Sequence, residues 1–311
     1  MTNKIINTNK AFKICLIVYL AIFIVGIAFT VIGGVKFDIN FVGGTRISYS
    51  YEGEIDEADL TKTIKGVIGK DLTVSKNTSI AGDVKTFAIS LSGNNSLATQ
   101  TQEDLTKKLT ETYSYNSIEL YDANSVSPTV AGNFLLKSLA AVVLTAIFVI
   151  IYVGIRFRRI GGVSAAITAL CALVFDILVS FFVCVIFRLQ IDSNYIAVIL
   201  TILGYSLNDT IVIYDRVREN KKLYPDKTVE ENMDMSVTGI LTRNIVTTTT
   251  TVLAVITIIV VAEIYGLASL RTFVIPMVFA LVSGCMSSLF ISGPLWVKWC
   301  NRKAARKAKK A

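Results

Sequence analysis

The stretch Val163–Phe187 reads VSAAITALCALVFDILVSFFVCVIF and decides the fold class. It is long enough to cross a bilayer as a helix, which takes about 20 apolar residues, and Asp176 is its only charged residue. Only 17% of the 311 residues are charged, against about 25% in ordinary globular domains. The sequence therefore predicts six transmembrane helices. The other five spans are Phe12–Ile32, Leu135–Ile155, Tyr195–Tyr214, Ile245–Ala262 and Phe273–Trp296.

The first span follows three lysines, as the apolar part of a secretory signal would. Its apolar run is too long for a signal peptide, and no small-residue cleavage site follows it. We therefore expect Phe12–Ile32 to remain as an uncleaved helix.

Lysine and arginine are concentrated in alternate connections, which predicts the orientation because cytoplasmic loops carry the positive charge. Six spans place every basic segment on one side, so both termini are expected in the cytoplasm. The net charge of +8 then reflects membrane topology and not nucleic-acid binding. The basic segments hold Lys4, Lys10 and Lys13; Arg156, Arg158 and Arg159; Arg216, Arg218, Lys221, Lys222 and Lys227; and Lys298, Arg302, Lys303, Arg306, Lys307, Lys309 and Lys310.

The chain divides into four parts. Residues 1–34 hold the N-terminus and first span, 35–133 form an insert, 134–297 hold the other five spans, and 298–311 form a basic cytoplasmic tail. The insert is expected outside the cytoplasm. Its polar connection between the second and third strands contains Ser75–Thr78 and the pair Gly82–Asp83. Its predicted elements are strand Ile47–Tyr51, helix Glu57–Ile68, strands Leu72–Val74 and Thr86–Leu91, helix Thr99–Thr112 and strand Ser117–Tyr121.

This βαββαβ order is that of a split βαβ unit. The predicted fold is thus an all-α six-helix membrane bundle carrying an inserted α+β, ferredoxin-like extracytoplasmic domain.

Several kinds of chemistry are excluded by composition. The chain has no histidine, so histidine triads, HExxH zinc sites and histidine proton relays cannot form. Its five cysteines lie in or at the ends of apolar stretches without metal-ligand spacing, as small buried side chains do. There is also no phosphate-binding P-loop and no nucleophile elbow. We expect neither an enzyme nor a bound metal or cofactor.

Three charged residues lie where a bilayer makes charge costly: Asp176, Asp209 and Arg243. Such residues are functional candidates by default. Asp209 lies well inside its span, within LGYSLNDTIVI (203–213). Helical spacing places Tyr205 and Ser206 on the same polar stripe. Asp209 is either a carboxylate that takes up and releases an ion or a structural residue hydrogen-bonded in the bundle.

Arg243 is the expected partner of Asp209, because arginine keeps its charge. It precedes the run Thr247–Thr251, so we expect a wet polar seam between spans four and five. Other interpretations remain open. Arg243 can mark the cytoplasmic end of the fifth span, the threonines can be packing residues, and Asp176 can be structural or a secondary polar member of the site.

Two longer motifs resemble a known family. GYSLNDTIVIYDRVREN (204–220) closely resembles the signature of the SecF family of protein-export membrane proteins, and FDINFVGGT (37–45) resembles the start of that family's external domain. Arg243 before a threonine-rich helix is similar as well. The motif residues include Asp38, Gly43, Gly44 and Gly204. One departure is Phe175, where many members carry histidine before the aspartate, which puts a histidine-assisted role there in doubt.

The resemblance implies half of a resistance-nodulation-division (RND) type transporter that pairs with SecD in the bacterial plasma membrane. It implies work beside the SecYEG channel after the SecA-driven stage, with the proton or sodium motive force helping unfolded polypeptide outward. Asp209, in the Asn208–Asp209 pair, and Arg243 then match the family's ion-coupling residues, with Asp176 as a secondary member. Gly43 and Gly44 would let the segment before the external domain bend, or form an ordinary turn.

Three competing functions remain for comparison. The chain can be half of an RND-type exporter of small molecules or lipids, or a passive assembly scaffold. An intramembrane aspartyl protease is disfavoured, because the G-x-G-D partner that Tyr214–Asp215 would need is absent.

Overall fold

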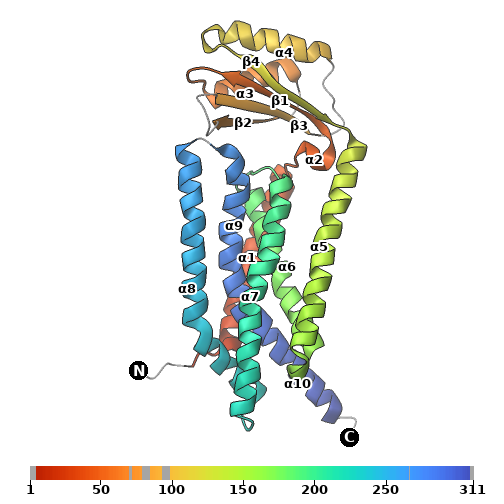
Figure 1. Cartoon of the computed structure of the whole chain (residues 1–311), viewed down its shortest axis with the longest axis vertical. Helices are drawn as coiled ribbons and strands as arrows, with labels where there is room; N and C mark the ends of the chain where they lie inside the picture. Colours follow the sequence, from red (N-terminus) through yellow and green to blue (C-terminus); the bar gives the residue numbers. More distant parts are fainter. Residues whose placement is uncertain (1–4, 70–71, 79–84, 93–98, 266, 309–311) are drawn as a thin grey trace.

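The computed structural model describes residues 5–69, 72–78, 85–92, 99–265 and 267–308. Within this part of the chain, six helices are long and apolar enough to cross a membrane. Figure 1 shows them side by side, with both termini at one end of the bundle and a sheet-containing domain at the other. The chain is therefore a multi-pass membrane protein. The spans are α1 (Thr8–Gly33), α5 (Pro128–Arg156), α6 (Gly162–Ile186), α7 (Ser193–Leu223), α8 (Val229–Ile264) and a last helix that begins with α9 (Ala268–Ser287).

The domain between α1 and α5 is a four-stranded antiparallel sheet with two helices. The strands lie in the order β2-β3-β1-β4. Along the chain the elements follow the predicted order, and both helices have the predicted bounds. The elements are β1 (Gly44–Tyr51), α3 (Glu57–Ile68), β2 (Thr73–Thr78), β3 (Lys85–Ser92), α4 (Thr99–Thr112), the 3-10 turn η1 (Ser114–Asn116) and β4 (Glu119–Val126).

The core of this domain lies between one face of the sheet and the two helices. Alternation along β1 places Ile47 and Tyr49 on that face, both fully buried. They pack in one cluster with Leu60 of α3 and Leu105 of α4. The other face of the sheet looks toward the membrane bundle across a cavity of about 820 Å³, lined partly by Arg46. The apolar face of the sheet thus packs against the two helices of the domain, and the opposite, polar face of the sheet is turned toward the bundle.

Two strand predictions need correction. The polar stretch Ser75–Thr78, expected as a connection, belongs to β2, which pairs with β3 along its length. Because β2 is at the edge of the sheet, it tolerates polar residues that an interior strand would not. The last strand begins at Glu119 and runs to Val126, beyond the predicted Tyr121. The predicted turn at Gly82–Asp83 lies outside the described residues.

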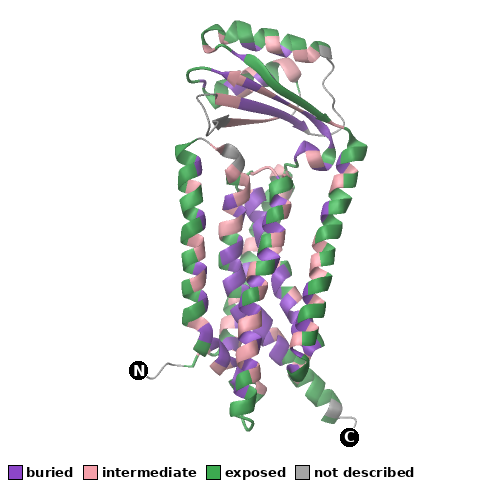
Figure 2. Cartoon of the chain, viewed as in Figure 1, coloured by how far each residue is buried: buried purple, intermediate pink, exposed green. Residues whose placement is uncertain are grey.

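Buried side chains of the bundle gather on α6, α7 and α9, whereas α8 exposes much of its length (Figure 2). Helices α7 and α8 also run well past the predicted spans into a polar hairpin. Thr228 caps α8 in a reciprocal capping box with Glu231. The expectation that the fifth helix begins near Ile245 is therefore wrong: hydropathy detects only its apolar part. Arg243 lies inside α8 and not at its start.

The sixth span is interrupted by a wide turn. The π-helical turn η3 (Ser288–Ser292) joins α9 to α10 (Gly293–Ala308). Such turns insert one extra residue per turn and recur at functional sites. The basic segment that begins at Lys298 is helical as far as Ala308, where α10 ends.

A short segment connects α1 to the sheet-containing domain and rests on the bundle. Asp38 N donates to Ile191 O at 3.0 Å, and Ile191 N donates to Lys36 O at 2.8 Å. Ile191 lies in the loop between α6 and α7. The short helix α2 (Ile39–Val42) follows and packs against α5. The entry to the sheet-containing domain is therefore hydrogen-bonded to the loop from which α7 begins.

Candidate functional site

Asp209 lies in the interior of the bundle, with only 3% of its surface exposed. Its Oδ2 atom makes no hydrogen bond within the described structure. Arg243 of α8 is near enough to attract the carboxylate electrostatically, yet no direct ion pair joins them among the described residues. The structure therefore places Asp209 and Arg243 near each other across the α7–α8 contact, but their charged atoms do not touch.

The Arg243 side chain is exposed and lines a cavity of about 650 Å³ between α7 and α8. The cavity also reaches Val212, which is one helical turn from Asp209. Toward the end that carries the termini, the cavity is lined by charged residues that include Asp215, Arg216 and Glu219. It is thus a polar route that stops one turn short of the buried carboxylate.

Two further polar side chains on α8 are buried beside Arg243. Asn244 and Thr248 are four residues apart, on one face of the helix, and are 1% and 7% exposed. Within the described structure, neither Asn244 Nδ2 nor Thr248 Oγ1 has a hydrogen-bond partner. Cys285 of α9 is close enough to interact with both Thr248 and Asp209. Buried polar atoms of this kind are normally satisfied by water or an ion. The Asn244 NH₂ is a donor and suits water, whereas the Asp209 carboxylate and the Thr248 hydroxyl oxygen suit water or a cation.

Asp176 is fully buried and accepts three hydrogen bonds from serines. Ser283 Oγ donates to Oδ1 at 2.6 Å, while Ser206 Oγ and Ser287 Oγ donate to Oδ2 at 2.7 and 2.9 Å. No cation pairs with Asp176 among the described residues. The carboxylate is therefore held by hydroxyl groups alone, and it joins α6 to α7 and α9.

Hydroxyl groups extend this network along the bundle. Tyr19 of α1 bonds to Ser283. Ser288 bonds to Thr210 at 2.9 Å and donates to Ser206 O at 3.1 Å. The π turn presents Ser288 and, one turn later, Ser292. A separate hydroxyl cluster lies closer to the end of the bundle that carries the termini. There Tyr214 bonds to Ser292 and to Thr168, both at 2.7 Å.

The threonine run makes mostly local bonds. Thr247, Thr250 and Thr251 each donate to a carbonyl of their own helix three or four residues back. One bond crosses to α7, from Tyr205 to Thr251 at 3.2 Å. This pattern agrees better with packing than with a set of ion ligands, and Thr248 is the member that is buried without a partner.

The structure does not bring Asn208 and Gly204 into the site. Both are on the exposed face of α7, four residues apart, and a Cβ on Gly204 would touch nothing within 4 Å. The Asn–Asp motif thus divides, with Asp209 inside and Asn208 outside the bundle.

Asp38, Gly43 and Gly44 lie where the sheet-containing domain meets the bundle. Asp38 is 2% exposed and accepts hydrogen bonds from Asn40 at 2.7 Å and Gln190 at 3.2 Å. Gly43 and Gly44 have φ of +80° and +135°. A Cβ on Gly44 would lie 2.0 Å from a β3 carbonyl oxygen. The glycines therefore permit a close approach of backbones.

Sequence reasoning placed Ser206 on the polar stripe of α7 but missed the other two serines around Asp176, Ser283 and Ser287, and the buried Asn244. Ser283 and Ser287 are four residues apart on a single helical face, and Ser288 and Ser292 repeat that spacing. This periodic hydroxyl pattern in an apolar span was the available signal. No such signal was present for Asn244, because that side chain is buried only by the packing of α8 against α7.

Six membrane helices, buried carboxylates in their core and a folded domain at one end define a multi-pass membrane protein of the transport class. The chain belongs to the SecD/SecF family of protein export membrane proteins, whose C-terminal family model matches residues 104–302.

Curated relatives match over nearly the whole chain. Protein translocase subunit SecF of Borreliella burgdorferi is 31% identical, over 94% of this chain and 96% of the relative. The SecF of Alicyclobacillus acidocaldarius is 30% identical, over 94% and 92%. Protein translocase subunit SecDF of Bacillus subtilis is 37% identical over 58% of this chain and 24% of its own length.

Solved structures show the same fold. A crystal structure of SecDF from Thermus thermophilus, described as a translocon-associated membrane protein, aligns with a TM-score of 0.76 at 23% identity, over 94% of this chain and 38% of that one. SecDF in its super-membrane-facing form aligns at 0.64 and 22% identity, over 98% and 39%. The chain therefore spans about two fifths of those longer proteins.

Proposed function

We propose that this chain is a SecF-type translocase subunit that uses the proton or sodium motive force to assist polypeptide export. The observation that carries the proposal is the Asp209 carboxylate, buried in the bundle and attracted by Arg243 without a direct ion pair. A carboxylate held in that way can bind a cation when one arrives. A polar cavity ends one turn away, which supports access from the end that carries the termini.

Ion binding at Asp209 neutralises its charge and removes its attraction to Arg243. Helices α7 and α8 then repack, driven by an ion gradient worth about 2.3 kcal/mol per elementary charge per 100 mV of potential. Thr248, whose hydroxyl oxygen can accept, holds the ion or an accompanying water beside Asp209, and the Asn244 amide NH₂ donates to that water. Asp176 serves as the secondary polar member, fastening α7 to α6 and α9.

The movement reaches the external domain through the segment that rests on the start of α7. Its support is the pair of backbone hydrogen bonds between Ile191 and residues Lys36 and Asp38. A shift of α7 displaces that loop, and hence α2 and β1. Gly43 and Gly44 then act as the bend in this connection.

The partners and location follow the family. The SecD half packs against the bundle in the bacterial plasma membrane, with the exposed Gly204–Asn208 face of α7 as the contact, since small and amide side chains favour close helix packing. Both termini face the cytoplasm. SecYEG and the SecA-driven preprotein complete the assembly.

The proposed division of the chain is 1–34, 35–133, 134–297 and 298–311. We class 35–133 as a ferredoxin-like extracytoplasmic domain, and its edge strands β2 and β4 as the place where unfolded polypeptide is gripped by strand addition.

The experiment is the export rate of a secreted protein in cells carrying Asp209→Asn, which keeps the volume and removes the charge. We expect export to fall at least about tenfold, with Arg243→Ala similar and Arg243→Lys intermediate. Asp226→Asn, in the exposed α7–α8 hairpin, is the matched control. Wild-type export with Asp209→Asn at equal protein level would refute coupling at this residue and favour a passive scaffold.

A further inference from the structure

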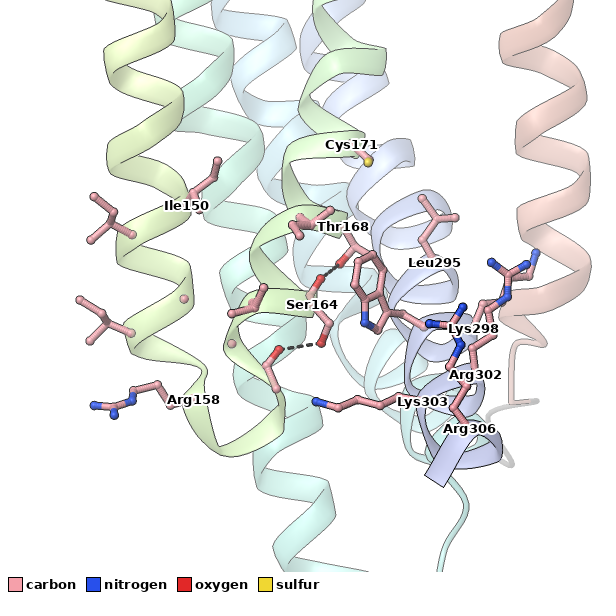
Figure 3. Close-up of a pocket in the computed structure, with 18 residues that line it drawn as sticks. Ile150, Arg158, Ser164, Thr168, Cys171, Leu295, Lys298, Arg302, Lys303 and Arg306 are labelled. Atoms are coloured by element: carbon pink, nitrogen blue, oxygen red, sulfur yellow. Dashed lines mark hydrogen bonds between the residues drawn. The ribbon is translucent and has the colours of Figure 1, made fainter. Parts of the chain in front are cut away.

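A third cavity lies between α5, α6 and α10, at the end of the bundle that carries the termini (Figure 3). Its volume is about 1300 Å³, more than a typical drug-sized ligand requires. It lies apart from Asp209, Arg243 and Asp176, and the proposed function does not use it.

Five basic residues line one part of the cavity, and none of its lining residues is acidic. None of the five forms an ion pair among the described residues. Lys298 instead lies 3.9 Å from the centre of the Phe12 ring, and Lys303 extends from α10 toward the α5–α6 turn (Figure 3). The cavity therefore carries an uncompensated positive charge. The basic residues are Arg158, Lys298, Arg302, Lys303 and Arg306.

The rest of the cavity wall is apolar and faces the surroundings of the bundle. Ile151, Ile155 and Val163 are 51%, 64% and 71% exposed, and Trp299 is at the same level as the basic residues on α10. Tryptophan is enriched at membrane–water interfaces. The apolar wall thus lies at the depth of acyl chains and the basic rim at the depth of headgroups.

Glycines shape this wall. The backbones of α5 and α6 approach closely here, since a Cβ on Gly162 would lie 2.0 Å from Gly154 O. A Cβ on Gly154 would touch nothing within 4 Å, and Gly154 lines the cavity. Side chains therefore leave this space open beside the two helices.

We propose that this cavity binds one anionic phospholipid of the cytoplasmic leaflet, with its phosphate among the α10 cations and its acyl chains along α5 and α6. Lysine and arginine pair strongly with phosphate oxygens, and basic pockets between membrane helices at the cytoplasmic side suit lipid headgroups. An acidic protein segment would match the charge, but it would leave the exposed isoleucines at membrane depth uncovered. Charge and apolar wall together select a lipid.

The test uses the purified full chain in detergent, with native mass spectrometry counting lipids retained on titration with phosphatidylglycerol or phosphatidylcholine. The variant replaces Arg302, Lys303 and Arg306 with glutamine. The matched control replaces Lys221, Lys222 and Lys227, which carry the same charge at the same end but do not line the cavity. We expect the first variant to bind phosphatidylglycerol at least about tenfold more weakly, and the control to bind it as the wild type does.

A steric variant separates a lipid from free phosphate. Gly154→Phe fills the apolar part, with Gly154→Ala as its control; we expect only the phenylalanine to displace phosphatidylglycerol. Glycerol phosphate, which lacks acyl chains, should not compete at matched concentration. Equal losses in the α10 variant and in the Lys221, Lys222 and Lys227 control, equal binding of phosphatidylcholine, or full competition by glycerol phosphate would each overturn the proposal. Lost co-purification of a partner protein with unchanged lipid binding would assign the surface to an acidic protein segment instead.

Discussion

Ser206 lies three residues before Asp209 on α7, and its Oγ atom donates a hydrogen bond of 2.7 Å to Asp176 Oδ2 on α6. The two buried carboxylates of the bundle are therefore joined by a single turn of α7. Asp176 accepts from serines on α7 and α9, whereas one oxygen of Asp209 accepts from no described group. Helix α7 thus donates to one carboxylate that is fully bonded, Asp176 of α6, and itself carries one, Asp209, that is available for binding.

Ser206→Ala removes one of the two donors to Asp176 Oδ2 and should lower stability. A hydrogen bond to a charged group contributes about 1.5–3 kcal/mol, so we expect the thermal unfolding midpoint in detergent to fall by about 4–8 °C. Thr201→Ala, which removes an exposed hydroxyl from the same helix, should change little. Equal midpoints for the two variants would contradict a structural role for the Ser206–Asp176 bond.

Replacing Asp176 should lower the stability of the fold, whereas replacing Asp209 should abolish export and leave stability nearly unchanged. Asp176→Asn places an amide NH₂ among serine hydroxyl donors, so the unfolding midpoint should fall by at least about 5 °C. Asp209→Asn should leave the midpoint within about 2 °C of wild type, because Oδ2 has no bond to lose, yet lose export. Paired melting curves and export assays check this. A large loss of stability with Asp209→Asn would indicate a structural carboxylate.

Asp192, outside the membrane at the start of α7, should give a pH-dependent stability. Burial raises the pKa of Asp192 and the charge of Asp38 adds to this, while hydrogen bonds from Thr272, Tyr195 and Asn194 oppose it. The folded chain therefore keeps the proton on Asp192 to a higher pH than the unfolded chain does. The stability that this proton binding contributes to the folded state is fully present below the unfolded pKa of about 4 and is lost as the pH rises through the folded pKa.

Asp192→Asn keeps the N-cap but not the buried charge. Its unfolding midpoint relative to wild type should rise as pH increases from about 4 to 7, measured in detergent across that range. Asp226→Asn, exposed in the hairpin, should show no such trend. A difference that shrinks with increasing pH would show that the hydrogen bonds to the ionised carboxylate outweigh its burial.

Gly44→Ala should unfold the entry to the sheet-containing domain. Its φ of +135° and a Cβ only 2.0 Å from Leu91 O combine strain with a clash, and we expect a loss of at least about 3 kcal/mol. Faster hydrogen exchange in β1 and β3 would report it. Gly66→Ala in α3, where a Cβ touches nothing within 4 Å, should instead stabilise by up to about 1 kcal/mol. Unchanged exchange in β1 with Gly44→Ala would mean that the chain adapts there.

Much of the fold was predictable because it depends on patterns along one dimension. The lengths of apolar runs predicted six spans, and periodicity predicted α3 with the observed bounds. The same reasoning failed where a helix continues through polar residues, because hydropathy does not detect that part of it. The polar first half of α8 is an example: its start at Val229 is determined by the Thr228 capping box and its pairing with α7, so Arg243 was placed at a helix start instead of inside one.

By itself, the sequence determined the membrane class, the family and the candidates Asp176, Asp209 and Arg243, because charge inside an apolar run is visible without a partner. Only the tertiary structure decided how these residues differ. Asp176 and Ser287 are 111 residues apart, and their bond exists because the π turn and the packing of α6 on α9 bring them together. The unpaired oxygen of Asp209 and the basic cavity beside α10 likewise depend on which helix faces are buried, and burial is a property of the packed bundle, to which distant segments contribute together.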